Sequence, residues 1–277
     1  MTDLDTRPSA GEVRQPTVDA RPSAGKAFRA ILWRDIYVTG KEFWVFLAQV
    51  ALQPLFMLFV FAKVLNAGGY VTDDYAHLLL PGIVALTAFL TALQTVSFPL
   101  IMEFSFTREI EDRLLAPLPT YLVAVEKLLL AVIRALASAV IMFPIGALVL
   151  GSAPWHTDGI PLLIAGLVLG SWVGAGIGLT LGTMVPPSKI SVIFAVILTP
   201  LMFTGATQYP WQSLDSMRWF QVVTALNPLT YLSEAVRAAV VPDVPHIAPW
   251  ICILVLLASG AASTAVGVRG FMRRAIN

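Results

Sequence analysis

The sequence predicts an all-α membrane protein with six transmembrane helices, and three observations carry this prediction. The chain is 57% hydrophobic with a mean hydropathy of +0.78, too apolar for a soluble domain of 277 residues. Six apolar stretches are each long enough to cross a bilayer, which takes about 20 residues. Of the 18 Lys and Arg residues, 14 fall in segments that this order of spans places on one side. Short basic loops stay cytoplasmic, so both termini are expected inside the cell.

The chain divides into a tail, a surface helix and a membrane domain. Residues 1–25 are rich in Pro, Ser and charge, which predicts a disordered cytoplasmic tail. In 26–43, apolar residues recur at helical spacing among basic ones, which predicts an amphipathic helix lying flat in the headgroup region. Residues 44–277 form the membrane domain, and 190–206 is its shortest span. The predicted spans are 44–62, 78–102, 128–150, 160–185, 190–206 and 247–268.

The stretch between the fifth and sixth spans is too polar for a span and too apolar for a free loop. It contains Trp211, Trp219 and the break Asn227-Pro228, followed by a second helical pattern. Backbone at membrane depth has to be helical or covered by protein. We therefore expect a re-entrant pair of helices on the outer side, interrupted at Pro228.

The second loop, 103–127, predicts a short amphipathic cytoplasmic helix over 103–115. Phe106, Ile110 and Leu114 recur every four residues, while Arg108 and Glu109 stand among the charges around them. An apolar ridge of this kind fits a groove on a partner protein. The alternative is a helix resting on the lipid surface, which its acidic residues disfavour because the cytoplasmic leaflet is anionic.

No catalytic, metal or cofactor site is expected in this chain. The three histidines are dispersed over separate loops, and the single cysteine excludes a disulfide framework. No Gly-x-x-x-x-Gly-Lys-Ser/Thr phosphate-binding loop occurs, so ATP cannot be held by that route. The charge asymmetry concerns the membrane, and no nucleic-acid partner is expected.

One predicted span carries a stripe of glycines at intervals of four. Missing side chains let another helix approach closely. We favour packing within one subunit over a subunit interface or a sliding seam. The stripe consists of Gly166, Gly170, Gly174, Gly178 and Gly182.

Arg134 is the one cation that this assignment places inside a span. Its long side chain can reach back to the cytoplasmic surface. Alternatively, it faces the interior of the bundle and pairs with Glu103 or Glu126.

Several short motifs resemble the type-2 ABC exporter permeases, in particular the daunorubicin-resistance-type membrane subunits and the lipooligosaccharide and polysaccharide exporters. Together they cover about residues 26–274, in the order of that family. In this chain the stretch between Arg108-Glu109 and Leu118-Pro119, Ile110 to Ala116, lacks the glycine that drug-export members often carry there. The motifs are Trp33-Arg34-Asp35, Pro54 to Met57, Leu79 to Ile83, Phe106 to Glu109, Leu118-Pro119 and Asn227 to Arg237.

The resemblance implies a permease domain over 44–277 that pairs with a second copy or a sister permease and with two cytoplasmic ATPase subunits. ATP and Mg would be bound by those ATPases and by nothing in this chain. The helix at 103–115 would be the coupling helix, with Phe106, Arg108, Glu109, Ile110 and Leu114 as its contact residues. The outer gate would be built from Trp211, Trp219, Asn227, Pro228, Tyr231, Glu234 and Arg237.

The function expected from these observations is ATP-driven export of a hydrophobic or amphipathic solute (a drug, lipid or glycolipid) across a bacterial inner membrane. The apolar spans offer few fixed polar groups, which favours such solutes over ions. One alternative is export of a lipid-linked polysaccharide. A second alternative is an ion-coupled secondary transporter. It is disfavoured because such a transporter needs titratable groups near the middle of the membrane, and no predicted span has an acidic residue at its middle. A membrane enzyme is disfavoured because acid, base and metal clusters are missing.

Overall fold

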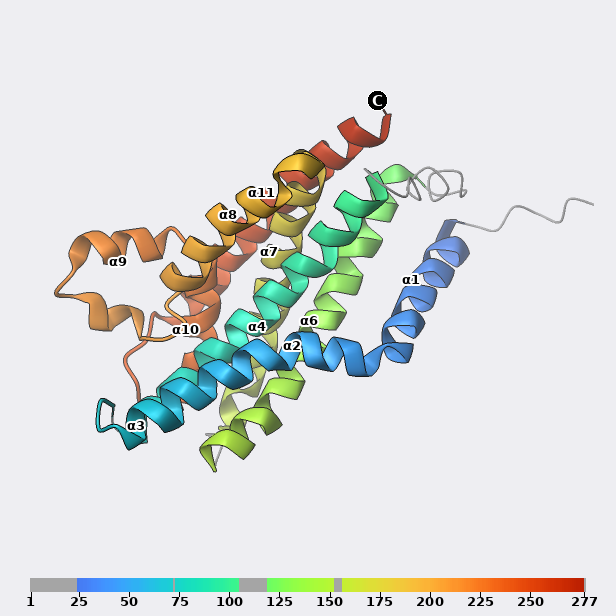
Figure 1. Ribbon diagram of the computed structural model, residues 1–277. Helices are drawn as coiled ribbons and strands as arrows, with labels where there is room; N and C mark the ends of the chain where they lie inside the picture. Colours follow the sequence, from blue (N-terminus) through green and yellow to red (C-terminus); the bar gives the residue numbers. More distant parts are fainter. Residues whose placement is uncertain (1–23, 72, 105–118, 152–155, 277) are drawn as a thin grey trace, which may run out of the picture.

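The structure is a computed structural model that describes residues 24–71, 73–104, 119–151 and 156–276, and within these ranges it contains helices and no strand (Figure 1). The predicted all-α class is therefore confirmed for the described chain. The tail to residue 23 and the ridge residues Phe106 to Leu114 lie outside these ranges, so the predictions made for them stay predictions.

Within the described residues, five helices are long and apolar enough to cross a membrane, which indicates a multi-pass membrane protein. The first combines α2 (Phe43–Leu58), a π-helical stretch (Phe59–Val64) and α3 (Leu65–Ala67). The others are α4 (Asp73–Met102), α6 (Thr120–Leu150), α7 (Ile160–Met184) and α11 (Pro249–Ile276).

Shorter helices complete the molecule. α1 (Ala24–Lys41) precedes α2 and contacts α6, close to the bounds predicted for the surface helix. α8 (Ile190–Thr204) has 15 residues, so its rise is about 22 Å, less than the hydrocarbon thickness of about 30 Å. The count of six spans is thus not confirmed. A 3₁₀ turn (Trp211–Leu214), α9 (Arg218–Ala225) and α10 (Pro228–Val240) follow.

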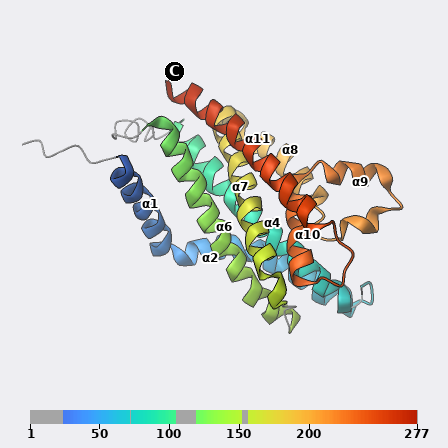
Figure 2. The same ribbon diagram turned by 180° about the vertical axis from the view of Figure 1, so that it is seen from behind.

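The core of the bundle is α4, of which 89% of the most apolar window is buried, against 22% for α11. It packs against α6, α7 and α10, and α11 covers α7 from the other side. α9 projects away from the bundle in both views (Figures 1 and 2). A helix with water on one side has an apolar face and a polar face. In α4 the faces are instead covered by other helices.

α6 begins at Thr120, eight residues before the predicted start of the third span at 128. The predicted span begins after Glu126 and Lys127 because charged residues are costly in lipid. Both are buried in protein, and Lys127 Nζ donates to Glu103 Oε1 at 2.8 Å. This pairing joins residues 24 positions apart, so hydropathy alone does not reveal it.

The C-terminal ends of α4, α7 and α11 meet at one end of the bundle, which we call the basal end. Phe104 stacks edge-on against Phe271, and the Arg274 guanidinium lies 4.9 Å from the centre of the Phe104 ring. Arg274 Nη1 also donates to the Thr183 carbonyl at 3.1 Å, which satisfies a free carbonyl at the end of α7. α11 therefore continues eight residues beyond the predicted end of the sixth span at 268, and its basic last turn closes this end of the bundle.

Candidate functional site

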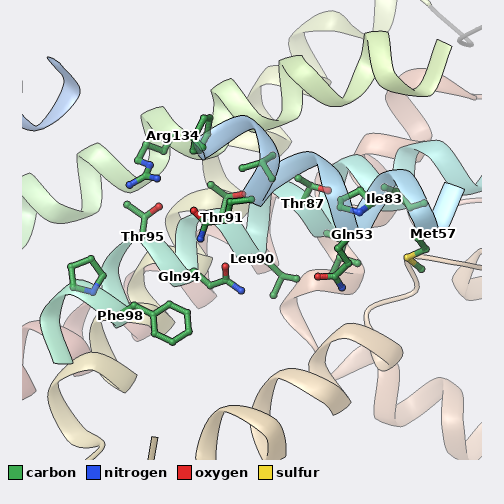
Figure 3. Close-up of a pocket in the computed structure, with 16 residues that line it drawn as sticks. Gln53, Met57, Ile83, Thr87, Leu90, Thr91, Gln94, Thr95, Phe98 and Arg134 are labelled. Atoms are coloured by element: carbon green, nitrogen blue, oxygen red, sulfur yellow. The ribbon is translucent and has the colours of Figure 1, made fainter. Parts of the chain in front are cut away.

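A cavity of about 240 Å³ lies between α2 and α4 and extends to α6 (Figure 3). On α4 it is bordered from Ile83 to Pro99, a rise of about 24 Å. Its border on α4 therefore extends over most of the hydrocarbon core, which is about 30 Å thick.

The lining of this cavity is polar for a membrane helix pair. It contains amides, hydroxyls and a guanidinium. These groups are Gln49, Gln53, Gln94, Thr87, Thr91, Thr95 and Arg134.

Helical spacing explains why these groups meet. Gln49 and Gln53 are four residues apart on α2, and Thr87, Thr91 and Thr95 repeat every four residues on α4. Residues at i and i+4 share one face of a helix, so each set forms a stripe. The sequence prediction of spans short of fixed polar groups missed this, although applying the i, i+4 rule to the polar residues would have found both stripes.

Two prolines add acceptors to the same cavity. Pro54 on α2 and Pro99 on α4 both line it. Proline has no N–H, so the carbonyls of Val50 and Thr95 lack their usual helical donor. Both helices therefore present backbone oxygen as well as side chains at this face.

Arg134 approaches the beginning of α2. Its guanidinium lies 5.0 Å from the centre of the Phe46 ring, in the first turn of that helix. Glu42, just before α2, is the carboxylate whose charge acts on it, but no ion pair joins the two described side chains. Arg134 Nε has no hydrogen-bond partner among the residues that the structure describes.

The structure does not support the predicted pairing of Arg134 with Glu103, since the Glu103 carboxylate accepts from Lys127. Glu126 precedes Arg134 by eight residues on the same helix, a rise of about 12 Å, which is too far for an ion pair. Arg134 lines the cavity instead (Figure 3).

A second group of polar residues surrounds α10, at the outer side in the predicted topology. Glu234 and Arg237 are both fully buried and form an ion pair one helical turn apart. Glu234 also accepts from the backbone N–H of Trp211 at 3.1 Å and of Ile247 at 3.0 Å. Arg237 Nη2 donates to the Ala206 carbonyl at 2.9 Å. The pair thus joins the end of α8, the 3₁₀ turn, α10 and the chain before α11.

Asn227 and Pro228 begin α10, as the predicted break requires. The Asn227 side chain caps the helix by accepting from the Leu229 N–H at 2.9 Å, and Pro228 occupies the first turn, where a missing N–H costs nothing. Asn227 Nδ2 also donates to the Leu201 carbonyl at 2.7 Å on α8. The predicted pair of helices separated at this point is present as α9 and α10, and their depth in a membrane stays a prediction.

Three aromatic residues predicted for the outer gate differ in their surroundings. The indole of Trp211 donates to the Gln221 carbonyl at 3.1 Å, and the hydroxyl of Tyr231 donates to the Ala225 carbonyl at 2.9 Å. Trp219 is 70% exposed on α9. The first two hold the segment together, whereas Trp219 faces outward.

The glycine stripe of α7 faces two helices of the same chain. A Cβ on Gly166 or Gly170 would meet Ala235 or Leu232 of α10. On Gly174 and Gly178 it would lie 2.6 and 2.4 Å from backbone oxygens of α4, and on Gly182 it would meet Leu100. The stripe therefore winds from α10 to α4, and these contacts lie within one subunit.

Comparison with known proteins agrees with these features. The chain matches the ABC-2 type transporter family over residues 26–241, which includes α1, the cavity and α10. It is 26% identical over 215 residues to a protein of Cyanophora paradoxa named "Putative transport permease ycf38", with 75% of this chain and 72% of that protein covered. The subtype within the family is not distinguished by these matches.

Proposed function

The chain belongs to the ABC-2 type transporter family, and on that premise we propose that it is the permease of an ATP-driven exporter for a hydrophobic or amphipathic solute. The observation that carries this proposal is the cavity between α2 and α4. Polar groups inside membrane helices are costly and mark solute pathways. The solute would leave from the cytoplasm or the inner leaflet of a cell membrane, with both termini of the chain cytoplasmic.

ATP hydrolysis is assigned to separate ABC ATPase subunits, with which permeases of this family normally work. We place their contact at the ridge of Phe106, Ile110 and Leu114, on the sequence pattern alone. ATP and Mg would be bound by those ATPase subunits.

A second permease, identical or a sister chain, would complete the path. Gln49 and Gln53 are exposed on α2 although both belong to an apolar membrane helix. Amide groups facing lipid would lack hydrogen-bond partners, whereas a facing permease or a water-filled path supplies them. This exposure favours an assembly in which α2 lies toward the partner.

The test is copurification in mild detergent with the ATPase encoded nearest the gene, followed by ATP hydrolysis in lipid. We expect a stable complex whose hydrolysis rate depends on this chain. A chain that purifies alone, and leaves the ATPase rate unchanged when the two are mixed, would contradict the proposal and favour an ion-coupled transporter.

A further inference from the structure

We propose that the cavity between α2 and α4 binds the anionic headgroup of a membrane amphiphile, with Arg134 as the anchoring cation. This inference rests on the proposed function, because it names the class of solute that the permease moves. It is carried by the unused donors of Arg134, the buried hydroxyl of Thr87, and the size and position of the cavity.

Arg134 presents a guanidinium for which the described residues supply no hydrogen-bond acceptor. The ring of Phe46 lies beside it and Nε makes no hydrogen bond within the described chain. A guanidinium binds phosphate or carboxylate through two parallel N–H donors, a geometry that lysine does not offer. A cation kept in an apolar helix without a paired carboxylate calls for an anion from outside the chain.

Thr87 supplies a second, independent indication of a ligand. It lines the cavity, is only 5% exposed, and its hydroxyl has no hydrogen-bond partner in the described residues. A buried hydroxyl without a partner is costly. Together with Gln53 and Thr91, it offers donors and acceptors for the hydroxyl or ester oxygens of a headgroup (Figure 3).

The size of the cavity selects a headgroup over a whole molecule. Sites that enclose a drug-sized ligand measure about 300–1,000 Å³, and this cavity is smaller at about 240 Å³. The hydrocarbon part of the solute would stay outside. Phe98, at the same end as Arg134 and stacked on Phe194 of α8 at 4.8 Å, provides an apolar wall for it (Figure 3).

The position of Arg134 fits the inner leaflet. Phe46, which it contacts, lies in the first turn of α2, at the end of the first span that the charge distribution places in the cytoplasm. In the predicted topology this end of the cavity therefore faces the headgroups of the inner leaflet. The Thr and Gln stripes then lead from Arg134 toward Met57 and Ile83, which gives the headgroup polar contacts along α4.

The test is lipid titration of the purified full chain in a neutral maltoside detergent, followed by native mass spectrometry. The probes are dioleoyl phosphatidylglycerol, dioleoyl phosphatidylcholine with the same tails, and inorganic phosphate. We expect the wild type to prefer phosphatidylglycerol. Arg134→Gln should weaken binding of that lipid at least about tenfold, because a charge-assisted hydrogen-bond partner is lost, and should weaken binding of phosphatidylcholine less, because the choline cation of that lipid offsets its phosphate charge.

Five further variants separate the site from general charge effects. Arg134→Lys should fall between the wild type and Arg134→Gln, and Glu42→Gln should strengthen phosphatidylglycerol binding because it removes the competing carboxylate. Thr87→Val should weaken it. Thr264→Val removes a hydroxyl that also has no partner among the described residues, on a half-buried residue away from the cavity, so it should have no effect. Arg218→Gln, on the exposed face of α9, controls for loss of a positive charge.

Equal binding of the two lipids, or a preference that survives Arg134→Gln, would overturn the proposal. So would an equal loss in Arg218→Gln. If inorganic phosphate binds through Arg134 while phosphatidylglycerol does not, the site takes a soluble anion and the amphiphile is excluded. If Arg134→Gln does not fold, phosphatidylglycerol binding is compared between Thr87→Val and Thr264→Val. Equal binding by these two variants would contradict the proposal. None of these measurements involves the ATPase, so they fail independently of the proposed function.

Discussion

Glu234 and Arg237 show how single residues of α10 hold several segments together. Each is completely buried, and between them they bind the backbone at Ala206, Trp211 and Ile247. Two charges lose their hydration in such a place, and only the pairing and the added hydrogen bonds offset that loss. Ala206 itself adopts a φ of +49°, a backbone conformation that is costly without glycine and that the Arg237 donor helps to maintain.

Removing one member of this pair should destabilise the protein strongly. Glu234→Gln leaves the Arg237 charge buried without its carboxylate, at a cost of about 3–5 kcal/mol. We expect a clear fall in the melting temperature measured by intrinsic tryptophan fluorescence in detergent. Arg218→Gln, on the surface, should leave the melting temperature unchanged. The double variant Glu234→Gln, Arg237→Met should recover part of the loss, and a Glu234→Gln protein as stable as the wild type would contradict the role assigned to the pair.

Gly82 is required for a close approach of backbone to backbone. A Cβ at this position would lie 1.7 Å from the carbonyl oxygen of Thr207, in the segment that follows α8. Backbone cannot rotate away as a side chain can, so Gly82→Ala should cost at least the 1–3 kcal/mol typical of overpacking. Gly40→Ala, where nothing lies within 4 Å, is the matched control. We expect a lower melting temperature for Gly82→Ala alone, and equal values for both variants would disprove this contact.

Among the elements, those defined by long apolar runs could be predicted and those defined by contacts between distant segments could not. α7 agrees with the predicted span to within one residue because nothing charged interrupts it. The early start of α6 depends on the pairing of Lys127 with Glu103, and the cavity depends on α2 lying against α4. A single sequence contains the Gln and Thr stripes, but not the fact that they face each other.

The ridge of Phe106, Ile110 and Leu114 is the element whose role depends on a partner. Changing all three to alanine should uncouple ATP hydrolysis from transport, because the apolar surface that would enter the ATPase groove is lost. The measurement is ATPase rate and solute transport in proteoliposomes, with membrane insertion checked by alkaline extraction. Val222→Ala with Val223→Ala, on the exposed side of α9, removes apolar side chains elsewhere and should leave coupling intact. Coupled transport that persists in the triple variant would remove the ridge from the interface.

At the scale of the whole molecule, the short α8 does not by itself reduce the number of membrane crossings. α7 and α11 both end at the basal end, where Arg274 donates to the Thr183 carbonyl. α11 must therefore begin at the opposite end, and the chain between Met184 and Pro249 has to return there. The 15-residue α8 covers much of that distance, and the segment after it reaches Gly82 of α4. This path favours an even number of crossings, although five helices in the part of the chain that the structure describes meet the length of a full span.

An even number of crossings places the two termini on the same side, whereas five crossings would place them on opposite sides. Reporters fused separately before Met1 and after Asn277, one active only in the cytoplasm and one active only outside it, distinguish the two cases. We expect a cytoplasmic signal at both ends, because Arg269, Arg273 and Arg274 crowd the last turns of α11 and basic segments resist translocation. A fusion after Leu150 or at Ser213 should report the opposite side. An external signal at Asn277 would mean that α8 does not return the chain across the membrane, and the assignment of the outer gate to the region around α10 would then have to be reversed.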